Sequence, residues 1–135
     1  MPRKQSRGII TFEDEKSGVQ LKFRTNKRGF EDMENYFLKI IEHFGVNNQQ
    51  RKLQEEIFEL QEAITIHEFK KTVEYEVPLF EIVGTREDII EEMADVFILL
   101  GQFKSYFDVS DEELEKTILK KINRTLDRIG SGYYE

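Results

Sequence analysis

Four acidic residues of this sequence stand in two pairs whose spacing suits metal binding. Glu56 and Glu59 form one pair, and Glu92 and Asp95 form a second pair 36 residues further along the chain. In a helix, residues three positions apart lie about one turn from each other on the same side. Carboxylates held together repel each other and oppose folding. A hard divalent cation such as Mg²⁺ removes that repulsion and, once bound, can promote hydrolysis of a phosphate ester.

The segments that carry these pairs have apolar stripes with a helical period. The stripes consist of Leu53, Ile57, Leu60, Ile64 and His67 in one segment and Ile89, Met93, Val96, Leu100 and Phe103 in the other. Glu56 and Glu92 flank their stripes at the same offset. If the two helices pack antiparallel through these stripes, the two pairs of carboxylates lie on one side of the helix pair. Glu55, turned away from this group, suits a supporting or proton-accepting role.

Two further helices are predicted from periodicity and capping signals. An apolar stripe begins near Glu31, and Gly45 provides a stop. Thr85 with Asp88 and Ser110 with Glu113 have the spacing of capping boxes, which predicts helix starts at both places. The last helix is expected to end at Gly130, and the stretch from Thr72 to Val83 to be extended or irregular.

The N-terminal residues predict strands instead. Ile9–Phe12 and Val19–Phe23 are short β-prone runs separated by a polar turn, Glu13–Gly18. The expected fold is therefore mainly α, a four-helix-type bundle with a short N-terminal β-hairpin. The expected organisation is an extension over 1–30, a helical domain over 31–130 and a tail over 131–135.

Composition narrows the class of protein. The 135 residues suffice for one domain, cysteine is absent, and the net charge is −7. Such an acidic chain is not expected to bind duplex nucleic acid, which needs a dense positive surface. The longest apolar run, Val96–Leu100, is too short to span a membrane. The first residues do not resemble a signal peptide, so we expect a cytoplasmic protein with no membrane partner.

A di-iron site of the ferritin type is the natural competitor to a Mg²⁺ site. It requires Glu-x-x-His pairs, and neither His43 nor His67 has an acidic residue three positions before it. Both histidines lie on or near apolar stripes, which favours a packing role. Glutamate pairs on a solvated helix surface are also common, so the residue types alone leave that simpler interpretation open.

The ordered set of motifs resembles the MazG-type, all-α nucleoside triphosphate pyrophosphatases. Their pattern is Glu-Glu-x-x-Glu, a spacer, Glu-x-x-Asp, and an Asn-Arg element on the last helix. The matching segments are Glu55-Glu56-Ile57-Phe58-Glu59, Glu92-Met93-Ala94-Asp95 and Asn123-Arg124. The resemblance covers about Phe37 to Arg128 and leaves the predicted hairpin outside.

The resemblance implies a homodimer or homotetramer that uses Mg²⁺, with Mn²⁺ able to substitute. It implies hydrolysis of ribo- or deoxynucleoside triphosphates to monophosphate and pyrophosphate, a reaction that cleanses the nucleotide pool. The implied residues are Glu55, Glu56 and Glu59 for catalysis, Glu56, Glu59, Glu92 and Asp95 for the metal, and Lys120, Lys121, Asn123 and Arg124 for the substrate. Relatives often carry a lysine four residues before the asparagine, and this chain has Leu119 there. Lys120 or Lys121 is the candidate to replace it.

Two other functions are compatible with the same sequence. A non-catalytic helical module could use the apolar stripes to dimerise or to bind a partner protein. A domain that binds another phosphorylated metabolite could use the same carboxylates. Both alternatives share the expected fold with the enzyme and differ from it at the acidic residues.

Overall fold

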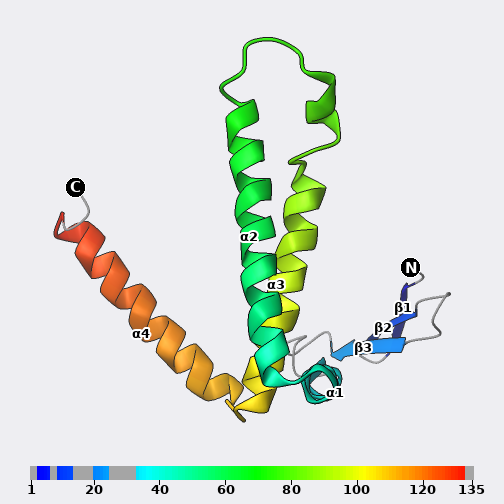
Figure 1. Cartoon of the computed structure of the whole chain (residues 1–135). Helices are drawn as coiled ribbons and strands as arrows, with labels where there is room; N and C mark the ends of the chain where they lie inside the picture. The colour runs from blue at the N-terminus through cyan, green and yellow to red at the C-terminus, as the bar shows by residue number, and fades with distance from the viewer. Residues whose placement is uncertain (1–2, 7–8, 14–19, 25–32, 133–135) are drawn as a thin grey trace.

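A computed structural model describes residues 3–6, 9–13, 20–24 and 33–132. This part of the chain is mainly helical, as predicted. Its helices are α1 (Glu34–Phe44), α2 (Val46–Lys70), α3 (Arg86–Tyr106) and α4 (Asp111–Gly130). α2 and α3 form a long antiparallel hairpin, α1 crosses the base of that hairpin, and α4 leaves the base in a different direction (Figure 1).

Local signals place the helix ends close to their predicted positions. Gly45 separates α1 from α2 with φ of 87°, a conformation that favours glycine. Thr85 and Ser110 each accept a hydrogen bond from the backbone N–H three residues later. Asp88 and Glu113 return the contact to the N-cap backbone, so both capping boxes are complete. α4 ends at Gly130 as predicted.

The described strands are β1 (Arg3–Ser6), β2 (Ile9–Glu13) and β3 (Gln20–Arg24). They form an antiparallel sheet in the order β1-β2-β3, with Gln5 opposite Ile10 and Thr11 opposite Lys22. The turn expected between the last two strands lies outside the described residues from position 14 onward, and so does the expected helix start at Glu31. The hairpin of the sequence analysis therefore stays a prediction.

The connection between α2 and α3 is irregular, as predicted, and contains a short 3₁₀ turn over Pro78–Glu81. It is tied back to the helices at its end. His67 Nδ1 lies 3.0 Å from the carbonyl oxygen of Gly84, and a Cβ added to Gly84 would stand 2.5 Å from the side chain of Ile66. His67 thus has a structural partner, in line with the packing role expected for it.

The interface between α2 and α3 matches the predicted one only in part, since Leu60 and Val96 of the stripes are half-buried and other stripe residues are exposed. Ala63 and Leu99 are buried, whereas Ile57 and Met93 from the predicted stripes are 40% and 43% exposed. Glu56, expected beside the interface, is only 5% exposed. The apolar faces are broad, so the two helices can pack at a different rotation from the one the stripes suggest. The acidic side of each helix lies nearer the interface as a result.

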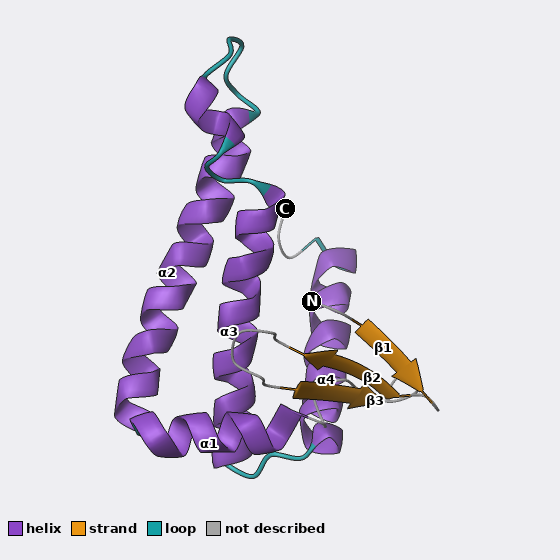
Figure 2. Cartoon of the chain, turned by 90° about the vertical axis from the view of Figure 1, so that its right-hand side faces the viewer, coloured by secondary structure: helices purple, strands orange, loops and turns teal. Residues whose placement is uncertain are grey.

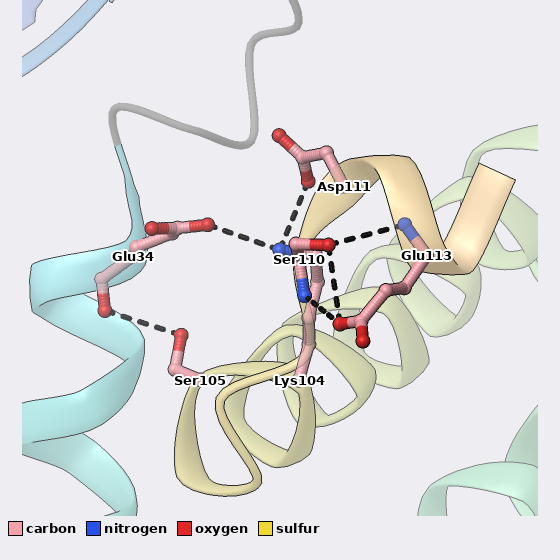
Figure 3. Close-up of polar contacts among 6 residues, drawn as sticks. All are labelled: Glu34, Lys104, Ser105, Ser110, Asp111 and Glu113. Atoms are coloured by element: carbon pink, nitrogen blue, oxygen red, sulfur yellow. Dashed lines mark hydrogen bonds and ion pairs between the residues drawn. The ribbon is translucent and has the colours of Figure 1, made fainter.

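The predicted four-helix bundle does not close within one chain. α4 points away from the α2–α3 hairpin (Figure 1), α1 crosses the base of that hairpin (Figure 2), and every residue from Glu112 to Gly130 is exposed. Its base is nevertheless fixed. Lys104 of α3 contacts Glu34 of α1 at 3.0 Å and Asp111 of α4 at 2.9 Å, and its side chain is only 14% exposed (Figure 3). These ion pairs join the start of α4 to α1 and α3.

Candidate metal site

Three carboxylates from two helices converge near the middle of the α2–α3 hairpin. Glu56 of α2 and Glu92 and Asp95 of α3, hereafter the acidic cluster, each offer one oxygen, and these oxygens lie within 4.8 Å of one another. The hairpin produces this arrangement because antiparallel packing sets Glu56 beside Asp95. Three carboxylate oxygens at this separation are a donor set that Mg²⁺ and Mn²⁺ accept.

Glu56 is the most deeply placed member of the acidic cluster. One of its oxygens, Oε1, lies 2.9 Å from the ammonium of Lys52. The other, Oε2, is buried and has no hydrogen-bond partner among the described residues. The hydrogen bond from Lys52 lowers the pKa of Glu56 despite its burial. A charged carboxylate with one buried oxygen left unpaired is costly, and a cation bound at that oxygen removes the cost.

Glu92 and Asp95 show the opposite electrostatic effect. Desolvation, followed by the charge of Glu59, raises the pKa of Glu92 from its usual 4.5 to about 7. Desolvation, followed by the charge of Glu56, raises the pKa of Asp95. Glu92 Oε2 is also buried without a hydrogen-bond partner in the described part of the chain. The protein therefore holds these groups together against their mutual repulsion.

Two other predicted acidic residues lie at the edge of this arrangement. Glu59 is exposed and close enough to Glu92 to affect its pKa, but it is not one of the three residues whose oxygens converge. Glu55 is 64% exposed, and its Oε2 lies 3.6 Å from Lys52. The structure thus gathers three of the four expected metal ligands closely and leaves Glu59 beside them.

The predicted substrate residues are not brought to the acidic cluster within one chain. Lys120, Lys121, Asn123 and Arg124 lie on the exposed part of α4, which points away from α2 and α3 (Figure 1). The resemblance that suggested them contains no information about which helices touch in a single chain. These residues can meet the acidic cluster only if α4 moves or if another copy supplies it.

Sequence reasoning missed Lys52 and a buried glutamine pair. Lys52 precedes Glu56 by four residues, a spacing that signals an ion pair along a helix. Gln49 Nε2 donates to Gln102 Oε1 at 2.7 Å, and these residues are 7% and 2% exposed. About two helical turns separate this pair from Glu56 and Asp95. The hydrogen bond fixes the same antiparallel register that places Glu56 beside Asp95, and only the three-dimensional structure reveals that the glutamines face each other.

An apolar groove of about 550 Å³ lies on α3 between α1 and the start of α4, and none of the acidic cluster lines it. Phe37, Phe97, Leu100, Phe107 and Leu114 form much of its wall. It is therefore separate from the candidate metal site. Among the described helices, none has the length and apolar character needed to cross a membrane.

Comparison with known proteins adds no assignment. No family model matches the sequence, and neither the curated proteins nor the solved structures contain a significant match.

Proposed function

We propose that this protein is a Mg²⁺-dependent hydrolase that cleaves nucleoside triphosphates to nucleoside monophosphate and pyrophosphate. The observation that carries the proposal is the convergence of three carboxylate oxygens within 4.8 Å. Two carboxylate oxygens of the same cluster, on Glu56 and Glu92, are buried without a hydrogen-bond partner among the described residues. Solvated surface glutamates do not show this pattern, because water satisfies their oxygens.

The ion would be held by Glu56, Glu92 and Asp95. Glu59, which lies beside them, would be a further ligand. When bound, Mg²⁺ or Mn²⁺ would neutralise charge on the phosphate chain and polarise a phosphoryl oxygen. The choice of a triphosphate substrate rests on the resemblance to MazG-type pyrophosphatases, whose acidic and Asn-Arg motifs are all present here. We place the reaction in the cytoplasm, where it would remove unwanted nucleotides.

The remaining chemistry falls to side chains beside the acidic cluster. Glu55 is exposed next to Glu56 and is suited to accept a proton from the attacking water. The water oxygen bonds to the α-phosphorus, the bond from that phosphorus to the bridging oxygen breaks, and pyrophosphate leaves with that oxygen. Glu55, Glu56 and Glu59 thus form the proposed catalytic motif.

We further propose that the active form is a homodimer or homotetramer of helical bundles. Six large apolar residues of α4 are between 41% and 59% exposed, namely Leu114, Ile118, Leu119, Ile122, Leu126 and Ile129. An apolar stripe of this length on one helix favours burial against another helix. The same helix carries Lys120, Lys121 and Arg124, whose charges complement the acidic cluster. A second copy that docks through α4 would bring Asn123 and Arg124 to the phosphate chain.

The direct test is release of pyrophosphate from a panel of ribo- and deoxynucleoside triphosphates with Mg²⁺. We expect Glu59→Gln and Asp95→Asn to reduce turnover by on the order of 100-fold, because each removes a carboxylate that supports the ion. Glu62→Gln is the matched control, since Glu62 is an exposed glutamate of the same helix outside the motif. If the wild-type protein releases pyrophosphate from none of these nucleotides, the proposed activity is wrong.

The exposed apolar surface supports one alternative. A non-catalytic module for helical dimerisation or protein binding would use the α4 stripe and the groove beside Phe97 and Leu114. Such a module has no need of the acidic cluster. Its Asp95→Asn variant would keep full oligomerisation or partner binding, and the wild type would show no hydrolysis.

A further inference from the structure

Lys52 is a positive charge that the chain itself places against the acidic cluster. Its ammonium lies 2.9 Å from Glu56 Oε1 and 3.6 Å from Glu55 Oε2. About half of its side chain, 52%, is exposed, whereas the Glu56 side chain is 6% exposed. The ammonium therefore stands at the rim of the site, between a buried carboxylate and solvent.

An ordinary helical ion pair does not have this geometry. At the end of the same helix, its C-cap residue Lys71 contacts Glu68 at 2.8 Å, with the two side chains 61% and 60% exposed. Exposed pairs of that kind contribute little to stability. Lys52 instead holds one oxygen of a buried carboxylate and leaves the other, Glu56 Oε2, without a hydrogen-bond partner. The ammonium and an ion at Glu56 Oε2 would then bind opposite oxygens of one carboxylate.

Two cations so close together repel each other, and a polyanion bound across both relieves that repulsion. An ammonium carries three donors, and Glu56 occupies one of them at full hydrogen-bonding distance. Lys120, Lys121 and Arg124, by comparison, lie along α4, away from the acidic cluster in the single chain (Figure 1). Lys52 is in position without any rearrangement of helices.

We propose that Lys52 is a phosphate-binding residue of the site, and that its ammonium contacts the phosphate chain beside the metal ion. The inference rests on the proposed function, because it assumes that an ion and a polyphosphate bind at the acidic cluster. The substrate site then includes a positively charged side chain of α2 as well as the proposed residues of α4.

The test uses the full chain, Mn²⁺ as the metal and inorganic tripolyphosphate as the anion. We expect Lys52→Met to bind Mn²⁺ alone about tenfold more tightly, because a competing positive charge is removed. With Mn²⁺ saturating, the same variant should bind tripolyphosphate at least about tenfold more weakly. Lys52→Arg should keep tripolyphosphate binding within about threefold of wild type, since it retains the charge. Lys71→Met, the matched control, should change neither affinity.

The outcomes separate the inference from the function on which it rests. If the wild type binds no Mn²⁺, both the proposed function and the role of Lys52 are lost. If the wild type binds Mn²⁺ and hydrolyses nucleotides but Lys52→Met binds tripolyphosphate as tightly as wild type does, only the role of Lys52 is wrong. Loss of Mn²⁺ binding in Lys52→Met would assign Lys52 to positioning Glu56 and would also overturn the inference. A second variant, Lys52→Gln, must also bind Mn²⁺ more tightly and tripolyphosphate more weakly than the wild type.

Discussion

Replacing Glu92 with glutamine separates two effects of the acidic cluster, the repulsion that destabilises the folded protein and the proposed binding of Mg²⁺. The folded protein raises the pKa of Glu92 from 4.5 to about 7, so this carboxyl group favours folding most when it is protonated. Its contribution to stability is complete below about pH 4.5 and is lost as the pH rises toward 7. The pKa of Glu56 is lowered and gives the opposite trend, but Glu92→Gln leaves Glu56 in place. The difference between wild type and variant therefore measures the charge of Glu92 together with its repulsion of Glu59, Glu56 and Asp95.

The shift sets the size of the effect. A pKa raised from 4.5 to about 7 corresponds to at most about 3 kcal/mol lost above pH 7. Glu92 is only half-buried, and water screens its charge, so we expect about 1–2 kcal/mol. In EDTA at pH 8, Glu92→Gln should be more stable than wild type by this amount, which is roughly 3–8 °C in Tm. At pH 5 the two proteins should melt within about 2 °C of each other.

Adding Mg²⁺ at pH 8 should make the wild type more stable than Glu92→Gln. When free Mg²⁺ is about one hundred times its Kd, the wild type gains about 2.7 kcal/mol, whereas Glu92→Gln has lost a ligand and gains much less. Thermal melts followed by circular dichroism, in EDTA and in MgCl₂ raised until the Tm of the wild type stops rising steeply, measure both effects. If wild type and Glu92→Gln melt at the same temperature in EDTA at pH 8 as well as at pH 5, the electrostatic reasoning is refuted. An undiminished Mg²⁺ shift in the variant would remove Glu92 from the metal site.

Three further predictions concern the scaffold. Gln102→Leu leaves the buried amide of Gln49 without its 2.7 Å acceptor and should lower the free energy of unfolding by about 1–3 kcal/mol in urea titrations; no loss would show that water replaces the bond. Gly101→Ala places a Cβ 2.5 Å from the ring of Phe37 and should destabilise by about 1–3 kcal/mol, which an unchanged urea midpoint would contradict. Lys104→Met removes the ion pairs at the base of α4 and should increase hydrogen exchange in the first turns of α4; unchanged exchange there would show that other contacts fix the helix.

The helices and their ends were predictable because their signals are local. Thr85 with Asp88 and Ser110 with Glu113 form closed hydrogen-bonded motifs within four residues. Gly45 ends α1 through its own backbone conformation. None of these signals depends on what the helix packs against, so one sequence was enough to place them.

The packing of the helices was less predictable. Ile57 and Met93 belong to regular apolar stripes but are about 40% exposed, whereas the neighbouring Glu56, Ala63 and Leu99 are buried. A stripe shows which face can be buried, and it does not show which neighbour buries it. The same limit applies to α4, whose capping box at Ser110 and Glu113 correctly predicted a helix start and could not predict that this helix leaves the hairpin.

The candidate site was predictable in its acids and incomplete in its supporting residues. Spacing identified Glu56, Glu92 and Asp95, and the structure brings them together. Lys52 was overlooked because lysines four residues from a glutamate are common on helix surfaces, and only the burial of Glu56 distinguishes this one. Burial of a single carboxylate depends on the exact rotation of two helices, which periodicity does not determine.

The hydrogen bond between Gln49 and Gln102 also has an evolutionary consequence. It fixes how α2 and α3 slide relative to each other below the acidic cluster, and the contact of His67 with Gly84 fixes them above it. The chain from His67 to Gly84 closes the hairpin and carries no carboxylate of the acidic cluster. Insertions and deletions between residues 68 and 83 should therefore be tolerated. Homologous chains are expected to differ most in length at this tip while the spacing within each acidic motif stays constant.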